Sequence, residues 1–377
     1  MDFDLSDEQR LLRDNVERLA ARAEAAPSGP AWSRERWKQF AELGLLALPF
    51  AEEDGGLGWG AVETMIVMEA FGKGLVREPY LSTVVIGGGF LRHGCGNAVR
   101  KELAGRIASG GLVATLAHVE REARHELADV ALSARATGES FVLDGVKSVV
   151  PDGDQAELLF VSARTAGGRH ERDGISLFRV DAKAKGVTRR AYALADGTPG
   201  AEIRLDNVVV PADALVGGAG KGLALIEHVT QEAIAALCAE AVGVMSAMGD
   251  MTVAYLKTRK QFGRPIGAFQ ALQHRAADMF IALEQARSMA VYATMMVGES
   301  DPAVRSAAIS AAKVTVGRNG RFIGEQAVQL HGGIGMTMEY RLGAYFKRMT
   351  AINLMFGDAD HHLRKVAKAG GLGQNIA

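Results

Sequence analysis

Two stretches of the sequence decide the fold that we predict. The first, YLKTRKQFGRPIGAFQALQHRAADM, spans residues 255–279, and the second, AVQLHGGIGMT, spans residues 327–337. In the first, a helical segment meets a short turn that contains glycine and proline, after which a second helix begins. In the second, paired glycines allow a ligand to approach the backbone closely, because glycine has no side chain. Both stretches predict connections between helices that can bind a ligand.

The side chains of the first stretch suit a phosphate-bearing ligand. A guanidinium held at a turn, such as that of Arg259, can bind a phosphate through two hydrogen bonds. Phe262 adds an aromatic face and Gln270 a planar amide. An ordinary helical hairpin with a surface arginine explains the first stretch equally well, and the glycines of the second stretch are also typical of a helix end.

Long segments rich in alanine and methionine surround these stretches. Their apolar faces and regularly placed charges predict a helical bundle with short connections; the segments lie at about 223–257, 267–297, 301–330 and 338–367. The preceding GGAGKG, residues 217–222, resembles a phosphate-binding loop. However, Lys221 is followed by Gly222 rather than by serine or threonine, so we interpret it as a turn into the next helix.

The middle of the chain changes to a period of two. SFVLDGVKSVV, residues 140–150, contains Asp144-Gly145 between β-prone runs, which predicts a hairpin turn. This change occurs between about residues 112 and 216, whereas residues 1 to about 130 are predicted to be mainly helical. Ser6 and Gln9 form a capping-box pattern at the start of the first helix, and further helices are predicted over 34–44 and 61–76.

Composition excludes several classes of protein. The 377 residues predict two or three domains, and the 43 basic and 44 acidic side chains lack the broad basic field of a nucleic-acid-binding protein. Cys95 and Cys238 have no CxxC spacing, and the adjacent His361 and His362 do not share a helix face, so we expect no metal site. The acidic start MDFDLSDEQRLLRD and the lack of a long uncharged apolar stretch predict neither export nor a membrane span, and hence a cytoplasmic protein.

The two stretches, the β-rich middle and the start DLSDEQRLL together resemble the acyl-CoA dehydrogenase family of flavoproteins, over essentially the whole chain. The resemblance implies an α+β fold with a helical N-terminal domain (1–111), a middle β-barrel-like domain (112–216) and a C-terminal four-helix bundle (217–377). It also implies binding of FAD and of an acyl-CoA thioester, which loses a proton to a carboxylate base and a hydride to the flavin. Assembly as a tetramer is expected.

The resemblance assigns residues to the nucleotide half of the FAD site. The RxxFG segment, with the region that follows it, and the QxxGG segment supply Arg259, Gln261, Phe262, Gln270, Gln329, Gly332 and Gly333. The flavin-facing segments of the middle domain depart from the family pattern. Val119 stands in place of a threonine, and KSVVPDG, residues 147–153, has Val149 and Pro151 where the family has tryptophan and threonine. An aromatic shield and two hydroxyl groups are therefore missing.

The largest departure concerns the catalytic base, because removal of an α proton needs a positioned carboxylate. The two positions at which the family places this glutamate hold Phe356 and Ala233. Glu240, seven residues beyond Ala233 on the same helix face, and Asp358 are the candidate replacements. An ordinary structural or surface carboxylate is the alternative interpretation of each. The apolar neighbours of Glu240 predict partial burial, which requires a partner for its charge.

These departures favour one function and leave two others open. The favoured hypothesis is a subunit of a heteromeric acyl-CoA dehydrogenase, for example a heterotetramer, in which a paralogous subunit supplies the base. By resemblance, an electron-transferring flavoprotein is the expected electron acceptor. The alternatives are a self-sufficient homo-oligomer that uses Glu240 or Asp358, and a non-catalytic subunit that stabilises an active paralogue.

Overall fold

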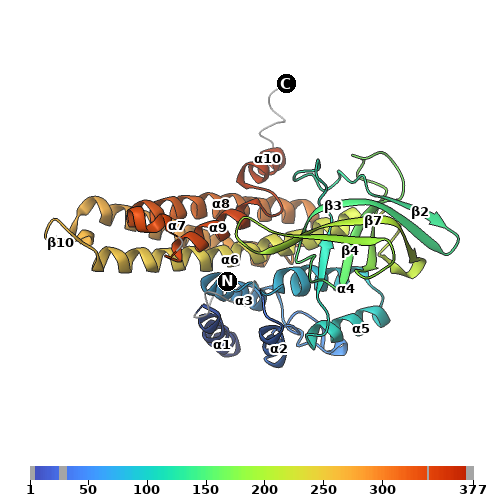
Figure 1. Cartoon of the computed structure of the whole chain (residues 1–377), viewed down its shortest axis with the longest axis horizontal. Helices are drawn as coiled ribbons and strands as arrows, with labels where there is room; N and C mark the ends of the chain where they lie inside the picture. Colours follow the sequence, from blue (N-terminus) through green and yellow to red (C-terminus); the bar gives the residue numbers. More distant parts are fainter. Residues whose placement is uncertain (1–4, 25–31, 338, 371–377) are drawn as a thin grey trace, which may run out of the picture. The chain divides into compact units, whose positions relative to one another are not determined.

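The structure, a computed structural model, describes residues 5–24, 32–337 and 339–370 (Figure 1). The chain divides into two compact units. The first unit contains the described residues of 1–29, 61–76 and 234–377, and the second contains those of 30–60 and 77–233. The boundary falls within the long helix α6 (Gly222–Thr258), so this helix contributes to both units.

The first unit is helical. It contains α1 (Asp7–Glu24), α3 (Ala61–Gly74), the larger part of α6, α7 (Gln270–Met296), α8 (Pro302–His331), the 3-10 turn η5 (Gly332–Met336), α9 (Leu342–Leu354) and α10 (Ala359–Ala369). Helix α8 packs against α7, α9 and α10, and α1 packs against α3. The capping box is confirmed: Gln9 N donates to Ser6 Oγ (3.2 Å), and Ser6 N donates to Gln9 Oε1 (3.0 Å).

Small residues allow the helices of this unit to approach closely. A Cβ atom added at Gly72 of α3 would lie 2.0 Å from the carbonyl oxygen of Glu240 on α6. A Cβ atom at Gly243 would lie 1.9 Å from the carbonyl oxygen of Glu69. These separations are far below contact distance, so α3 and α6 can pack in this way only because both positions are glycine.

The predicted helix over 338–367 is wrong in one respect, because two helices occupy this segment. Residue 338 lies outside the described residues. Helix α9 ends at Leu354, and the backbone then turns through Phe356 (φ 57°) and Gly357 (φ 108°), which adopt positive φ angles. Asp358 then begins α10 by accepting a hydrogen bond from His361 N at 2.7 Å. The sequence pattern missed this break, because apolar residues continue at helical spacing on both sides of it.

The second unit contains the sheet. Among the described residues, the sheet has eight strands: seven lie in the order β6-β7-β3-β2-β4-β5-β8, and the eighth, β1, pairs with β4. The strands are β1 (Ala114–Ala117), β2 (Ser133–Thr137), β3 (Ser140–Pro151), β4 (Leu158–Arg164), β5 (Ile175–Asp181), β6 (Val187–Ala193), β7 (Pro199–Pro211) and β8 (Leu215–Val216). The unit also contains α2 (Arg34–Glu42), the π-helix η2 (Leu81–Gly87), α4 (Gly88–Gly94), α5 (Asn97–Ala108) and the start of α6.

The hairpin turn predicted at Asp144-Gly145 is wrong. Both residues lie inside the continuous strand β3, where the pairing with β7 shifts register between Leu143 and Gly145. The turn lies earlier, at Gly138 (φ 58°), between β2 and β3. Gly145 is needed for another reason: its φ is 145°, and a Cβ atom there would lie 2.8 Å from the Leu132 side chain. An Asp-Gly pair is thus a bulge signal as well as a turn signal.

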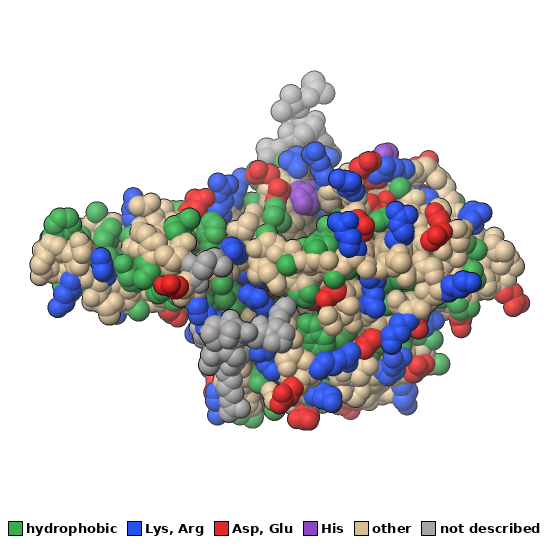
Figure 2. All heavy atoms as spheres, viewed as in Figure 1, with side chains coloured by type: hydrophobic (Ala, Val, Ile, Leu, Met, Phe, Trp, Pro, Cys, Tyr) green, Lys and Arg blue, Asp and Glu red, His purple; other side chains and the backbone are tan. Residues whose placement is uncertain are grey.

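Two features of the structure concern nucleic-acid binding and membrane insertion: the mixture of charges on the surface and the burial of α6. Basic and acidic side chains are interspersed on the face drawn in Figure 2, in keeping with the net charge of −1. Helix α6 is long and apolar enough to cross a membrane by length and composition, yet 78% of its most apolar window is buried inside the structure. Such burial is usual for a core helix, whose apolar side chains are used in packing.

Acid is expected to destabilise the first unit through His362. Burial, and then the charge of Lys313, lower the pKa of His362 from 6.5 to about 3. Between these values the unfolded chain binds a proton that the folded chain does not, so stability is lost as the pH falls below 6.5. At pH 5 this group alone costs about 2 kcal/mol relative to pH 7. Urea unfolding at both pH values should show a smaller pH dependence in His362→Gln.

The control for this experiment is His274→Gln, because His274 is exposed on α7. This variant should keep the pH dependence of the parent chain. The buried His118 of the second unit, whose pKa burial likewise lowers to about 3, remains in all three proteins and contributes equally to each. Equal pH dependence in the parent chain and in His362→Gln would contradict the prediction.

Candidate functional site

The connection between α6 and α7 is a small antiparallel ribbon. Strands β9 (Lys260–Gln261) and β10 (Arg264–Pro265) pair across a turn made by Phe262 and Gly263. Ile266 N donates to Arg259 O at 2.8 Å and closes the ribbon at its base. The sequence predicted this turn from its glycine and proline. The ribbon carries three of the predicted ligand-binding residues, namely Arg259, Gln261 and Phe262.

Phe262 stands out within the ribbon. Its side chain is 91% exposed, and its backbone has φ 54°, a conformation that costs a non-glycine residue on the order of 1 kcal/mol. The neighbouring Arg264 guanidinium lies 4.2 Å from the Phe269 ring centroid, so it is already engaged. An apolar ring held in water by a strained backbone is a surface suited to a flat ligand or to another subunit.

The end of α8 forms the second part of the site. Gly332 (φ 62°) follows the last residue of α8, and added Cβ atoms at Gly332 and Gly333 would meet nothing within 4 Å. The backbone of this turn is therefore open to a ligand. Gln329, one turn earlier, is exposed, as is Gln270 at the first residue of α7.

An aromatic stack connects the two stretches. The imidazole of His331, at the end of α8, stacks on the Tyr255 ring near the end of α6, with centroids 4.6 Å apart. His331 Nδ1 contacts Ala327 O at 2.8 Å, and its Nε2 contacts the Tyr340 hydroxyl at 3.2 Å. Burial lowers the pKa of His331, so the ring in this stack is neutral at neutral pH. The C-terminal ends of α6 and α8 thus lie together, as a ligand contacting both stretches would require.

The flavin-facing segments named by the resemblance are neighbours within the second unit. Ser148 N donates to Val119 O at 2.8 Å, and Thr115 Oγ1 donates to Pro151 O at 2.7 Å. These bonds hold the segment that follows β1 beside the end of β3. The Val149 side chain is 39% exposed, so an apolar surface lies where the family pattern has an aromatic ring.

A buried ion pair joins the same two segments. Lys147 Nζ, which is fully buried, lies 2.8 Å from Glu120 Oε1 and donates to Ser162 Oγ at 3.0 Å. Glu120 also accepts from the backbone N–H groups of Ala131 and Leu132, at 2.9 and 3.0 Å. Burial lowers the pKa of Lys147 to about 8, although Glu120 opposes this shift. The glutamate after Val119 therefore serves to hold the strands together.

Glu240 is buried and paired, as the sequence predicted. Its side chain is 4% exposed, and Arg348 of α9 binds both carboxylate oxygens, at 2.5 and 2.9 Å. The ammonium of Lys313 on α8, also buried, interacts with both Glu240 and Asp358. Burial lowers the pKa of Lys313 to about 8. The charge of this buried lysine therefore acts on both candidate bases.

The two positions at which the family places its catalytic glutamate hold Phe356 and Ala233, which have no acid group. Phe356 forms the positive-φ turn between α9 and α10, and its carbonyl oxygen contacts His362 Nε2 at 3.0 Å. Ala233 on α6 is fully buried. Asp358 has one oxygen engaged as the cap of α10.

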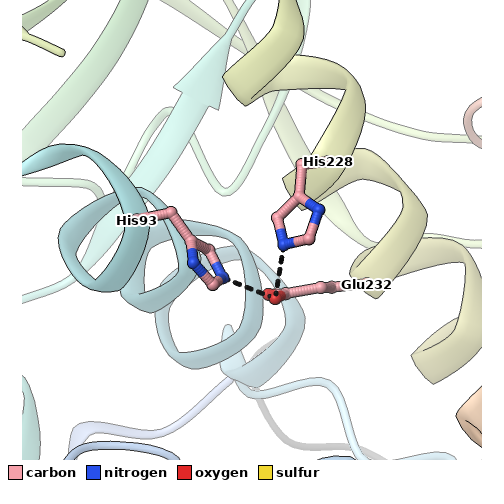
Figure 3. Close-up of side chains that lie close together, drawn as sticks. All are labelled: His93, His228 and Glu232. Carbon is pink, nitrogen blue, oxygen red and sulfur yellow. Dashed lines mark hydrogen bonds and ion pairs between the residues drawn. The ribbon is translucent and has the colours of Figure 1, made fainter. Parts of the chain in front are cut away.

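The sequence did not predict a cluster of polar side chains in the second unit. His93 of α4 lies beside His228 and Glu232 of α6 (Figure 3). The spacing of His228 and Glu232, four residues apart on one helix, was a usable signal. His93 could not be found in this way, since it lies 139 residues from Glu232.

Comparison with known proteins identifies the same family that the sequence resembles. Three family profiles match the chain: the acyl-CoA dehydrogenase N-terminal domain over residues 6–111, the middle domain over 115–208 and the C-terminal domain over 220–371. The probable acyl-CoA dehydrogenase YngJ of Bacillus subtilis (strain 168) is 30% identical over 350 residues, which are 90% of this chain and 92% of the relative.

Solved structures share the whole fold. The FAD complex of PigA superposes with a TM-score of 0.90 at 25% identity, covering 99% of this chain and 100% of that chain. A chain of the ChsE4–ChsE5 complex from Mycobacterium tuberculosis superposes with a TM-score of 0.86 at 25% identity, covering 100% of this chain and 100% of that chain. The predicted fold, with helical N- and C-terminal domains and a β-rich middle domain, is confirmed. The chain therefore belongs to the acyl-CoA dehydrogenase family of flavoprotein oxidoreductases, which act on CH–CH groups.

Proposed function

We propose that the chain is one subunit of a heteromeric, FAD-dependent acyl-CoA dehydrogenase, in which a paralogous subunit supplies the catalytic base. The observation that carries this proposal is the pair Phe356 and Ala233 at the two positions where the family places its glutamate. Neither side chain can accept a proton. The ChsE4–ChsE5 complex is a relative that contains two different chains, which supports a paired assembly.

The residues at the ends of α6 and α8 fit the nucleotide part of FAD. Phe262 offers a solvent-facing ring, the exposed Arg259 a guanidinium, and Gly332 and Gly333 an open backbone. A guanidinium suits a pyrophosphate, an aromatic face suits a flat ring, and an open glycine backbone allows close approach. We therefore assign FAD binding to these residues together with Gln261, Gln270 and Gln329.

The chain's own residues have binding and positioning roles in this reaction. FAD, when bound, supplies the acceptor for the hydride that leaves the β carbon of the acyl group. Val119 and Val149 offer apolar surface to the ring system, while the backbone groups of the paired segments offer hydrogen bonds that do not depend on side-chain identity. The α proton is taken by a carboxylate of the paralogous subunit.

The contacts of Glu240 and Asp358 favour a catalytic base that is supplied by the paralogous subunit. Arg348 binds both oxygens of Glu240, so this carboxylate is already engaged in a structural ion pair. An oxygen of Asp358 caps α10. The self-sufficient enzyme and the non-catalytic subunit remain the alternatives.

Amide variants separate these alternatives. Anaerobic flavin reduction by acyl-CoA thioesters is measured for the chain, for Glu240→Gln and for Asp358→Asn, each alone and with the paralogous subunit. The proposal expects no reduction by the chain alone and unchanged reduction by the variants in the complex. Loss of reduction in either variant, with its fold intact, would support the self-sufficient enzyme, whereas a chain that stays colourless alone and in complex would support the non-catalytic subunit.

The other partners follow from the family resemblance. We propose an acyl-CoA thioester as substrate, an electron-transferring flavoprotein as acceptor, a tetrameric assembly and a cytoplasmic location. The two cysteines, Cys95 and Cys238, are both free thiols, as a reducing compartment would maintain them. The start MDFDLSDEQRLL and the segment FGDAD are similar to the small subunit of pimeloyl-CoA dehydrogenase, which suggests a medium or bulky acyl group.

Phe262 is expected to contribute to FAD binding without contributing to stability. Phe262→Ala should weaken FAD affinity by about fivefold to tenfold, because contact with an aromatic face is worth about 1 kcal/mol. The free energy of unfolding should change by less than about 0.5 kcal/mol, because the ring is exposed. Flavin fluorescence titration measures the affinity. The control is Phe280→Ala, whose ring is 63% exposed on α7 outside the ribbon; equal FAD affinity in both variants would contradict the assignment.

A further inference from the structure

Two imidazoles of the second unit lie close to one carboxylate oxygen, Glu232 Oε1. His93 comes from α4, and His228 and Glu232 come from the first part of α6 (Figure 3). His93 Nε2 lies 2.7 Å from Glu232 Oε1, and His228 Nε2 lies 3.6 Å from the same oxygen. The imidazole rings meet edge to face, with centroids 4.5 Å apart.

The spacing of these atoms matches a metal coordination shell. Zinc binds histidine nitrogen at about 2.0–2.1 Å and carboxylate oxygen at about 2.0–2.2 Å, so neighbouring ligands of a tetrahedral site lie about 3.3 Å apart. The two nitrogen–oxygen separations, 2.7 and 3.6 Å, lie on either side of that value. One candidate ligand atom from each residue lies within 4.8 Å of the others. To reach that value, the His93–Glu232 separation would open by about 0.6 Å and the His228–Glu232 separation would close by about 0.3 Å.

Arg92 orients the carboxylate of Glu232 toward the two histidines. Its Nη2 donates to Glu232 Oε2 at 2.8 Å, so the guanidinium fixes one oxygen and leaves Oε1 facing the histidines. Outer hydrogen bonds of this kind orient metal ligands. One oxygen of the Glu232 carboxylate is thus held by Arg92, and the other is directed at the two imidazoles.

The site is reachable from solvent. The His93 side chain is 35% exposed and that of His228 is 26% exposed, whereas Glu232 is 12% exposed. Two imidazoles and one carboxylate suit Zn²⁺ better than Mg²⁺ or Ca²⁺, which prefer oxygen ligands. Three protein ligands also leave the fourth position of a tetrahedral site for water.

We propose that His93, His228 and Glu232 bind one Zn²⁺ ion, with water as the fourth ligand. Each histidine presents the lone pair of Nε2, so its proton lies on Nδ1, and the hydrogen bond between His93 and Glu232 is replaced by two bonds to the metal. The ion connects α4 to the start of α6, two segments far apart in the sequence.

Zinc titration of the purified, tag-free chain tests the proposal. Isothermal calorimetry should show one Zn²⁺ per chain. His93→Ala, His228→Ala and Glu232→Gln should each weaken the affinity by more than about 100-fold, since loss of an outer hydrogen-bond partner alone costs about 10–100-fold. Co²⁺ in place of Zn²⁺ should give the visible absorption bands of a four-coordinate site, and these bands should be lost in the same variants.

Control variants show whether the loss of zinc affinity is specific to the three proposed ligands. His274→Ala removes an exposed histidine of the first unit and should bind Zn²⁺ like the parent chain. Circular dichroism confirms that each variant is folded, and His228→Gln replaces His228→Ala if the latter is not. A parent chain that takes up less than one Zn²⁺, or His93→Ala and His228 variants that bind it as the parent does, would overturn the proposal and leave the cluster as an ion-pair network around Glu232.

Discussion

Replacing Arg348 with methionine is expected to lower the free energy of unfolding by about 3–5 kcal/mol, because it leaves the carboxylate of Glu240 buried without its main partner. Glu240 is 4% exposed, and Arg348 supplies hydrogen bonds to both of its oxygens. The charge of Lys313 also acts on Glu240, so the loss should fall near the lower end of this range. Urea unfolding of the parent chain and of Arg348→Met measures the difference.

Two comparisons make this result specific. Arg321→Met removes an exposed arginine that pairs with Glu325 four residues along the same helix, and such pairs contribute about 0.3–0.5 kcal/mol. The double variant Glu240→Gln with Arg348→Met removes both charges and should recover part of the lost stability. If Arg348→Met cost no more than Arg321→Met, the buried ion pair would not be formed in solution.

Replacing Lys147 with methionine is expected to have an effect of similar size in the second unit, about 3–5 kcal/mol. Lys147 is fully buried, and its Nζ contacts Glu120 Oε1 and Ser162 Oγ. Without it, Glu120 keeps its two backbone hydrogen bonds but loses its counter-charge. Because this pair joins the two segments expected to face the flavin, Lys147→Met should weaken FAD binding as well as stability.

The two units require separate treatment in this measurement. A chain with two compact units can unfold in more than one step, so each transition is fitted by itself, with circular dichroism reporting the helices and the sheet. Lys183→Met, which replaces an exposed lysine of the same unit, is the control and should lie within about 0.5 kcal/mol of the parent chain. A Lys147→Met variant as stable as this control would contradict the structural role of the pair.

The sequence predicted the helical parts well, because their signals are local. Glycine and proline mark the turn after α6, and the Ser6–Gln9 capping box marks the start of α1. The break at Phe356 was missed, because this residue is held at positive φ by its surroundings rather than by a preference of its own. Asp144-Gly145 was misread as a turn, because the same dipeptide also suits a bulge within a strand.

The site could be predicted only in part. The resemblance named the ligand-binding residues of the α6–α7 ribbon and the end of α8, and the Tyr255–His331 stack brings these two stretches together. The partner of Glu240 could be expected but not named, because Arg348 is 108 residues away. Arg92 and His93, which complete the cluster around Glu232, come from a different helix and have no local signal.

The location of the catalytic base can be tested with the anaerobic visible spectrum of the FAD-loaded chain, recorded before and after addition of a panel of acyl-CoA thioesters. We expect a yellow protein that keeps its flavin absorption when alone and loses it once the paralogous subunit is present, because the proton acceptor belongs to that subunit. Rapid bleaching of the chain alone would exclude this assignment and would place the base within this sequence, with Glu240 and Asp358 as the first residues to replace.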